Sequence, residues 1–179
     1  YFLDFETFMQ AIPPYDGTRP YQQIPFQYSL HSIAREGAPL EHREFLAEPN
    51  TDPRAEIARR LAGEIPEHAC VIAYSSNFEA RILGELADQF LEHREKLRLI
   101  MGNLRDLAIP FRSRDVYSWE MGGAYSQKVV LPAFVPELNY DGMEVADGGM
   151  AMDAYARMCA SRDPGEIESI RKALLEYCK

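Results

Sequence analysis

The opening of the chain, residues 2–7 (FLDFET), constrains its fold more than any other stretch. Apolar residues alternate with carboxylates there, which is the period-two pattern of a β-strand. Asp4 and Glu6 then share one face of the strand, while Leu3 and Phe5 lie on the other. Two neighbouring carboxylates repel each other unless a positive group lies between them. The stretch is therefore either an edge strand with one wet face or one wall of a site for Mg²⁺ or Mn²⁺.

Length and composition indicate one ordinary globular domain. The chain has 179 residues, of which 46% are hydrophobic and 26% charged, which suits one soluble α/β domain. No apolar run approaches the ~20 residues of a membrane helix. The three cysteines form no Cys-x-x-Cys pair, which favours a reducing, cytoplasmic compartment over a zinc or disulfide framework. Because the sequence begins with Tyr and opens in a strand, we expect a segment of a longer chain, whose other domains are possible partners.

The net charge of −9 limits the ways in which this chain could meet nucleic acid. It argues against a protein that coats nucleic acid through a global basic field. It leaves open an enzyme whose carboxylates hold metal ions, because the metals then carry the positive charge of the site.

Turn residues and hydrophobic periodicity divide the rest of the chain into strands and helices. Loops are expected at 11–20, 122–128 and 139–149, and strands at 26–33, 41–47, 70–74 and from Asp106 to Pro110. Helices are expected from residue 51, at 78–89, 91–103, 149–160 and 167–178. The predicted fold class is α/β, with an antiparallel three-strand meander, further parallel strands and helices on both faces. This order is the one seen in ribonuclease H-like folds.

Glu79 adds a third carboxylate at a place where a site could form. It follows a predicted strand and a polar turn, so it lies in the first turn of a helix. The helix dipole favours a carboxylate there, and a capping role alone would explain it. The alternative is that Glu79 faces the end of the first strand and joins Asp4 and Glu6 in binding metal.

Two stretches together resemble the motifs of a nuclease superfamily. Residues 4–7 (DFET) resemble the first motif of the DnaQ-like 3′–5′ exonucleases, and residues 77–79 (NFE) resemble their second. Glu79 stands where that family usually has Asp. Residues 174–177 (LLEY) resemble the start of their Tyr-x3-Asp motif, whose Asp would fall just past Lys179. We therefore interpret residues 1–179 as one nuclease domain, truncated just before its last catalytic Asp.

The resemblance extends along the whole chain and implies a mechanism. Residues 20–31, 125–128 and 175–179 are similar to a bacterial branch of DnaQ-like domains. The implied activity is two-metal hydrolysis of phosphodiester bonds at single-stranded ends of DNA or RNA. It would use Mg²⁺ or Mn²⁺ held by three carboxylates, while Tyr177 orients the attacking water. The implied metal ligands are Asp4, Glu6 and Glu79.

Substrate contacts are expected around these carboxylates. The resemblance implies that Thr7 and Asn77 lie near the terminal nucleotide. Ser126 and Lys128 follow a glycine pair and could contact a phosphate, although a lone lysine is more often solvated.

Further residues have both a structural and a functional interpretation. His31 and Asp106 could border the site or be structural, and the rim would include Asp141, Asp147 and Asp153. Aromatic residues could stack on bases or simply pack; these are Tyr117, Trp119 and Tyr125.

Two functional alternatives remain at this stage. One is a weak or inactive nuclease-fold module that binds nucleic acid or a protein partner, which the Glu79 substitution keeps open. The other is a nuclease that cuts internally.

Overall fold

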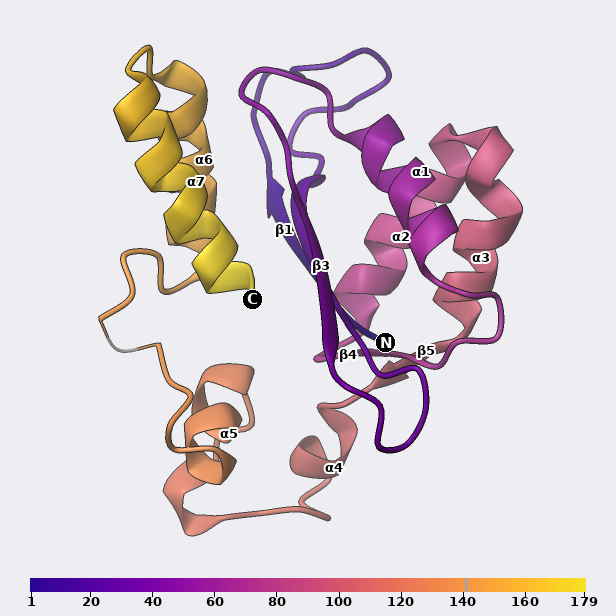
Figure 1. Cartoon of the computed structure of the whole chain (residues 1–179), viewed down its shortest axis with the longest axis vertical. Coiled ribbons are helices and arrows are strands. Elements are labelled where there is room, and N and C mark those ends of the chain that lie inside the picture. Colours follow the sequence, from indigo (N-terminus) through magenta and orange to yellow (C-terminus); the bar gives the residue numbers. More distant parts are fainter. Residues whose placement is uncertain (141) are drawn as a thin grey trace.

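The computed structural model describes residues 1–140 and 142–179 and shows a five-stranded mixed sheet between two groups of helices (Figure 1). The strand order is β3-β2-β1-β4-β5, with β1, β2 and β3 antiparallel and with β4 and β5 parallel to β1. The predicted α/β class and mixed sheet are confirmed. The strands are β1 (Phe2–Phe8), β2 (Ile24–Ser32), β3 (Glu41–Leu46), β4 (Val71–Ala73) and β5 (Leu104–Asp106).

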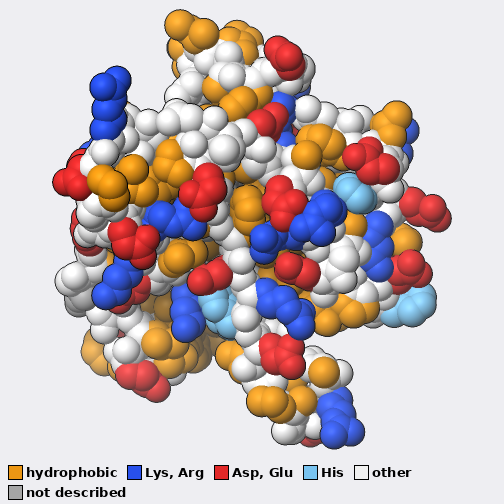
Figure 2. All heavy atoms as spheres, turned by 45° about the horizontal axis from the view of Figure 1, so that its top comes forward, with side chains coloured by type: hydrophobic (Ala, Val, Ile, Leu, Met, Phe, Trp, Pro, Cys, Tyr) orange, Lys and Arg blue, Asp and Glu red, His pale blue; other side chains and the backbone are white. Residues whose placement is uncertain are grey.

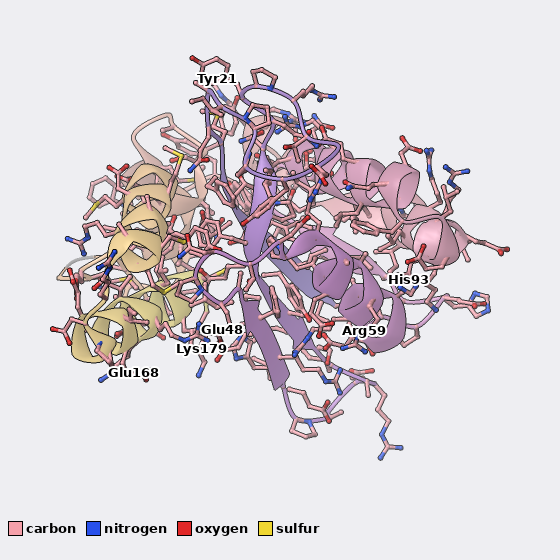
Figure 3. All side chains as sticks on the ribbon, turned by 90° about the horizontal axis from the view of Figure 1, so that it is seen from above. Tyr21, Glu48, Arg59, His93, Glu168 and Lys179 are labelled. Atoms are coloured by element: carbon pink, nitrogen blue, oxygen red, sulfur yellow. The ribbon has the colours of Figure 1, made fainter. Side chains whose placement is uncertain are left out.

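Helices cover both faces of the sheet, as Figure 3 shows from above. One face carries α1 (Arg54–Glu64), α2 (Asn77–Gln89) and α3 (Arg94–Gly102), and the other carries α6 (Gly148–Ala160) and α7 (Pro164–Cys178). Short elements join these groups: η1 (Leu91–His93), α4 (Ile109–Arg112), η2 (Trp119–Met121) and α5 (Gln127–Phe134). No helix among the described residues combines the length and apolar character needed to cross a membrane.

The alternation of β1 divides its side chains between two layers. Leu3 and Phe5 are buried in the core formed with α1, α2 and α3. Asp4 and Glu6 point to the opposite layer, the one that α6 and α7 cover. Since β1 is the middle strand of the sheet, the interpretation of residues 2–7 as an edge strand is wrong.

A β-bulge interrupts the pairing of β1 and β2 directly beside Glu6. Glu6 pairs with Gln27, but Thr7 pairs with Pro25, so Phe26 is the extra residue. Pro25 has no N–H to donate, and a bulge is one of the few places where a central strand tolerates proline. Beyond the bulge, Phe8 packs with α6 and α7, against the ring of Tyr155. The bulge therefore sets the direction of side chains next to the carboxylates.

The segment after α3 departs from the sequence-based expectation. Asp106 was expected to begin a strand, but it ends β5, and residues 109–112 form α4 instead. The reason is that Asp106 Oδ1 accepts hydrogen bonds from the backbone N–H groups of Ser75 and Ala108, which turns the chain. Pro110 lies in the first turn of α4, where a missing N–H costs nothing.

The expected loop at 122–128 ends earlier than predicted. Ser126 is the N-cap residue of α5, so Lys128 lies on a helix rather than in a loop. Tertiary packing explains this difference, because Val130 on the same helix is buried and lines a cavity with residues of distant segments.

Candidate active site

The two carboxylates of β1 lie in different local environments. Glu6 is buried at 9% exposure, whereas Asp4 is exposed to a cavity. The start of α6 lies against Glu6, since a Cβ on Gly148 would be 3.5 Å from Glu6 Oε2. Asp4 and Glu6 therefore face the same layer of the molecule, one open to the cavity and one enclosed beside it.

Glu79 lies in the first turn of α2 and is almost fully buried, with 2% exposure. One carboxylate oxygen bonds to its own backbone N–H, and the other, Oε2, has no hydrogen-bond partner among the described residues. A buried polar atom without a partner costs free energy and is rare in native proteins. Such an atom points to a group that binds there.

The charge of Asp4 disfavours the ionised forms of both Glu6 and Glu79. Burial and the charge of Asp4 raise the pKa of Glu6 to about 8, and burial followed by the charges of Asp4 and Asp106 raises the pKa of Glu79 to about 8. Desolvation by surrounding protein raises the pKa of Asp4 to about 6. The backbone N–H of Phe5 partly offsets this desolvation by donating a hydrogen bond to the Asp4 carboxylate, which lowers its pKa. Without a cation, Glu6 and Glu79 therefore hold protons at neutral pH.

Two side chains from distant elements reach this cluster. The Tyr177 hydroxyl, near the end of α7, donates a hydrogen bond to Glu6 and lowers the pKa of that carboxyl. Lys128 also lowers the pKa of Glu6 through its positive charge. The Lys128 Nζ donates to the carbonyl oxygen of Ala146 at 2.7 Å and lies 5.6 Å from the ring centroid of Tyr140.

A cavity of about 850 Å³ opens beside these residues. Its polar side includes Asp4, Ser29, His31 and Tyr177, and Lys128 borders it. Most of its apolar lining comes from β4, α4, α5 and the segments that follow them. Lys179 also lines the cavity, and Figure 3 shows it on the sheet side of α7, opposite Glu168. The volume is in the range of ~300–1,000 Å³ typical of ligand sites.

The predicted site residues are thus brought together only in part. Asp4, Tyr177, Ser126 and Lys128 line the cavity, while Glu6 and Glu79 couple electrostatically to Asp4. Thr7 lies away from the cavity lining, and its hydroxyl accepts a hydrogen bond from Gln23 Nε2 at 3.4 Å. Asn77 is the exposed first residue of α2 and also lies off that lining.

The rim candidates have mostly structural roles. Asp106 shapes the turns on either side of β4 and β5, although its charge also reaches Glu79. Asp147 caps α6 by accepting a hydrogen bond from the N–H of Met150. Asp153 is exposed on α6, and Asp141 lies outside the described residues.

Other residues at the site escaped sequence reasoning. Gln27 is buried on β2 and donates from Nε2 to the carbonyl oxygen of Leu174 at 2.7 Å, which ties α7 to the sheet three residues before Tyr177. Its position between Phe26 and Tyr28 in a strand was the available signal. Tyr140 tilts against Tyr177 with ring centroids 6.3 Å apart, and no local pattern predicts that contact.

The donor set is suited to a hard divalent cation, but it is not a ready-made metal site. In the part of the chain that the structure describes, no three His, Cys, Asp or Glu side chains lie together as a metal-binding group. The available oxygens are nevertheless those that Mg²⁺ and Mn²⁺ prefer, and the unpartnered Oε2 of Glu79 lacks a positive partner. The residues therefore fit such an ion in chemistry.

Comparison with known proteins gives one match. Residues 1–126 match the model of a domain of unknown function, DUF2779. This is well over half of the 179 residues, so the chain belongs to that family. Neither curated proteins nor solved structures gave a match. The matched region contains β1, β4 and α2 with their three carboxylates, and Lys128 and Tyr177 lie after it.

Proposed function

We propose that this chain is a metal-dependent nuclease with a ribonuclease H-like fold, and that it is a 3′–5′ exonuclease of the DnaQ-like type. The observation that carries the proposal is the arrangement of Asp4, Glu6 and Glu79, in which Asp4 lines a large cavity and its charge raises the pKa of each of the other two carboxyls. The β3-β2-β1-β4-β5 sheet, with its antiparallel meander, supports the fold assignment.

The cluster suits Mg²⁺ or Mn²⁺, which Asp4, Glu6 and Glu79 would hold. A bound divalent cation supplies charge for a phosphate and lowers the pKa of a bound water. Before it binds, Glu6 and Glu79 must release their protons, because only the ionised forms are good ligands. The acidic cluster, repulsive by itself, then attracts both a cation and an anionic phosphate.

Tyr177 acts in this proposal as a donor that stays protonated. Burial and the charges of Glu6 and Asp4 raise the pKa of its phenol above the ordinary value. Its hydroxyl therefore donates to Glu6 at neutral pH and does not act as a base. In the complex with substrate we expect the same hydroxyl, at the cavity wall, to orient the attacking water.

The substrate we propose is an end of DNA or RNA, bound locally rather than through a basic field. Figure 2 shows Lys and Arg side chains intermixed with Asp and Glu over the visible face, without a continuous basic area. Lys128 and Ser126 at the cavity are the nearest candidates for a phosphate contact. The three free cysteines favour a cytoplasmic location.

A second candidate is a nuclease-fold module that binds nucleic acid or a protein without cutting. The observation that favours it is the absence of a ready three-ligand metal group among the described residues. Glu79 in place of the Asp of DnaQ-like enzymes points in the same direction.

Degradation of end-labelled strands distinguishes these candidates. We expect Mn²⁺-dependent shortening of 5′-labelled single strands by the native chain, and none by the Asp4→Ala/Glu6→Ala variant. The matched control is Glu92→Ala/Glu95→Ala, which removes two exposed carboxylates from η1 and α3. A ladder of products indicates end-wise cutting. Equal rates for the native chain and the Asp4→Ala/Glu6→Ala variant would refute the metal–carboxylate mechanism.

A further inference from the structure

One wall of the cavity is a row of three aromatic rings from three separate elements. Tyr74 follows β4, Phe111 is on α4 and Phe134 ends α5. The Tyr74 and Phe111 rings are 6.3 Å apart between centroids and 26° from parallel, and the Phe111 and Phe134 rings are 5.6 Å apart and tilted. All three side chains line the cavity. The row is assembled by tertiary structure, so its members have no common sequence motif.

The row is held in position by contacts outside the cavity. The Tyr74 hydroxyl donates to the backbone carbonyl oxygen of Tyr125, which fixes the start of α5 against the end of β4. Val130 and Leu131 extend the apolar wall on α5. Phe134 is nevertheless 46% exposed, which is unusual for a phenylalanine in an otherwise ordered helix. The rings thus form a fixed apolar wall that still meets solvent.

The cavity that the aromatic row lines also has polar lining residues. The cavity is bounded on its polar side by Asp4, Ser29 and Tyr177. A ligand that fills both sides needs a flat apolar part and, next to it, a group that pairs with the carboxylate site. A nucleotide unit has both parts, since every base has a π-face and its phosphate can be bridged to carboxylates by a cation.

We propose that the Tyr74–Phe111–Phe134 row stacks on an unpaired base of the nucleic-acid strand whose phosphate approaches Asp4. This inference rests on the proposed nuclease function and names the form of the substrate, a single strand with its base present. A base in a duplex has both faces covered by its neighbours, so it cannot lie on the row without being unpaired first.

Two strongly exposed aromatic side chains lie outside the lining of the cavity. Trp119 is 81% exposed and Tyr117 is 53% exposed, but neither lines the cavity. Both are more exposed than Phe111 and lie outside the cavity lining. Trp119→Ala is therefore a matched control for loss of an aromatic ring outside the cavity.

Binding without metal tests the stacking directly. A labelled oligothymidine, the same strand made of abasic units and a blunt duplex are titrated with the chain in EDTA, by fluorescence anisotropy. We expect the oligothymidine to bind best. Phe111→Ala should weaken its binding about tenfold and leave the abasic strand unchanged, because one base–aromatic stack is lost. Trp119→Ala should bind all three probes like the native chain.

A second variant guards against misfolding. Phe134→Leu keeps an apolar side chain at a half-exposed position but removes the π-face, so the fold should persist, as far-UV circular dichroism can verify. It should also weaken oligothymidine selectively. Native-like oligothymidine binding by both variants, or equal binding of normal and abasic strands by the native chain, would overturn the proposal and leave the row to another ligand, such as a protein side chain.

The result is independent of whether the chain cuts nucleic acid. Stacking is measured in EDTA, so a catalytically inactive chain can still show the loss in Phe111→Ala. Conversely, a chain that degrades strands through Asp4 and Glu6 but binds abasic and normal strands equally would retain the proposed function and lose only the aromatic subsite.

Discussion

Two side chains, Arg54 and Glu79, are buried to nearly the same extent, at 3% and 2% exposure, but their surroundings are opposite. The Arg54 guanidinium binds both oxygens of Asp52, and it also donates to Gln89 Oε1 at 2.7 Å and to the carbonyl oxygen of Asp16 at 2.9 Å. Its charge is thus paired, and its hydrogen bonds connect α1 to α2 and to the loop before β2.

Glu79 is compensated far less, through a hydrogen bond from its own backbone N–H to one carboxylate oxygen. Its nearest charged influences, Asp4 and Asp106, have the same sign, and its Oε2 has no partner among the described residues. Burying a charge is costly unless it is paired and hydrogen-bonded. The contrast teaches that Arg54 stabilises the fold, whereas an ionised Glu79 is buried at a cost that a proton or a bound cation relieves.

The largest expected loss of stability follows from replacing Arg54, the buried side chain whose charge is paired. Arg54→Met should lower the free energy of unfolding by about 3 kcal/mol, because it leaves Asp52, Gln89 and a backbone carbonyl without their donor. Urea denaturation measures it. Arg59→Met is the control, since the Arg59 side chain is 61% exposed in a surface ion pair and its loss should change the free energy of unfolding far less. Equal losses would show that Arg54 has no special structural role.

Glu79→Gln is expected to raise the free energy of unfolding at alkaline pH, whereas Arg54→Met lowers it. Folded Glu79 keeps its proton up to about pH 8, whereas an unfolded glutamate loses it near 4.5. The native state therefore binds more protons between these values, and its stability falls as pH rises through them. Glu79→Gln removes this loss, so at pH 8 it should be more stable than the native chain by about 1–3 kcal/mol. At pH 5 the two should be similar.

Urea denaturation at the two pH values measures this difference. Added Mn²⁺ at pH 8 should stabilise the native chain more than Glu79→Gln, because the ion replaces the missing positive partner. A variant that is less stable than the native chain at both pH values would mean that Glu79 is an ordinary satisfied core residue.

An intermediate loss of stability is expected at Asp106, whose carboxylate accepts two backbone hydrogen bonds and whose charge also acts on Glu79. Asp106→Ala removes the acceptor for the N–H groups of Ser75 and Ala108 and should cost about 1–2 kcal/mol. Ser75 has a φ of 61° just before the helix that carries Glu79, so activity should fall as well. Asp106→Asn keeps an acceptor oxygen and should retain most of the stability. Thermal denaturation of both variants and the native chain measures the difference. If the Asn variant unfolds as easily as the Ala variant, the charge of Asp106 and not its acceptor role is what matters.

The smallest stability change is expected for Tyr177→Phe. It removes one hydrogen bond to Glu6, worth about 1 kcal/mol or less. Since this bond lowers the pKa of Glu6, its loss should raise that pKa and move the acidic limb of the pH–rate profile to higher pH. Phe at this position keeps the ring contact with Tyr140. An unchanged limb with a lower maximal rate would show that Tyr177 acts on the substrate alone.

The sequence pattern within single strands and helices was enough to predict how the three carboxylates are placed on their own elements. The alternation in β1 places Asp4 and Glu6 on one face, and the strand–turn–helix junction places Glu79 in a first helical turn. The meander and the mixed sheet follow from turn residues and periodicity in the same way.

Features that depend on contacts between distant residues could not be predicted. The bulge at Phe26 requires the pairing of β1 with β2, and the turn at Asp106 requires Ser75 to lie opposite. Phe111 was not singled out because its neighbours in the row come from elements far away in sequence. Burial, which raises the pKa of Glu6, likewise exists only after α6 and α7 have packed on the sheet.

Calorimetric titration of the chain with Mn²⁺ at pH 7, in two buffers that differ in ionisation enthalpy, tests the central claim most directly. If Asp4, Glu6 and Glu79 form a cation site, Mn²⁺ binds and protons are released, because the pKa values of Glu6 and Glu79 are about 8 before binding. The Asp4→Ala/Glu6→Ala variant then loses both the binding and the proton release. Binding without proton release, or equal binding by that variant, would contradict the account.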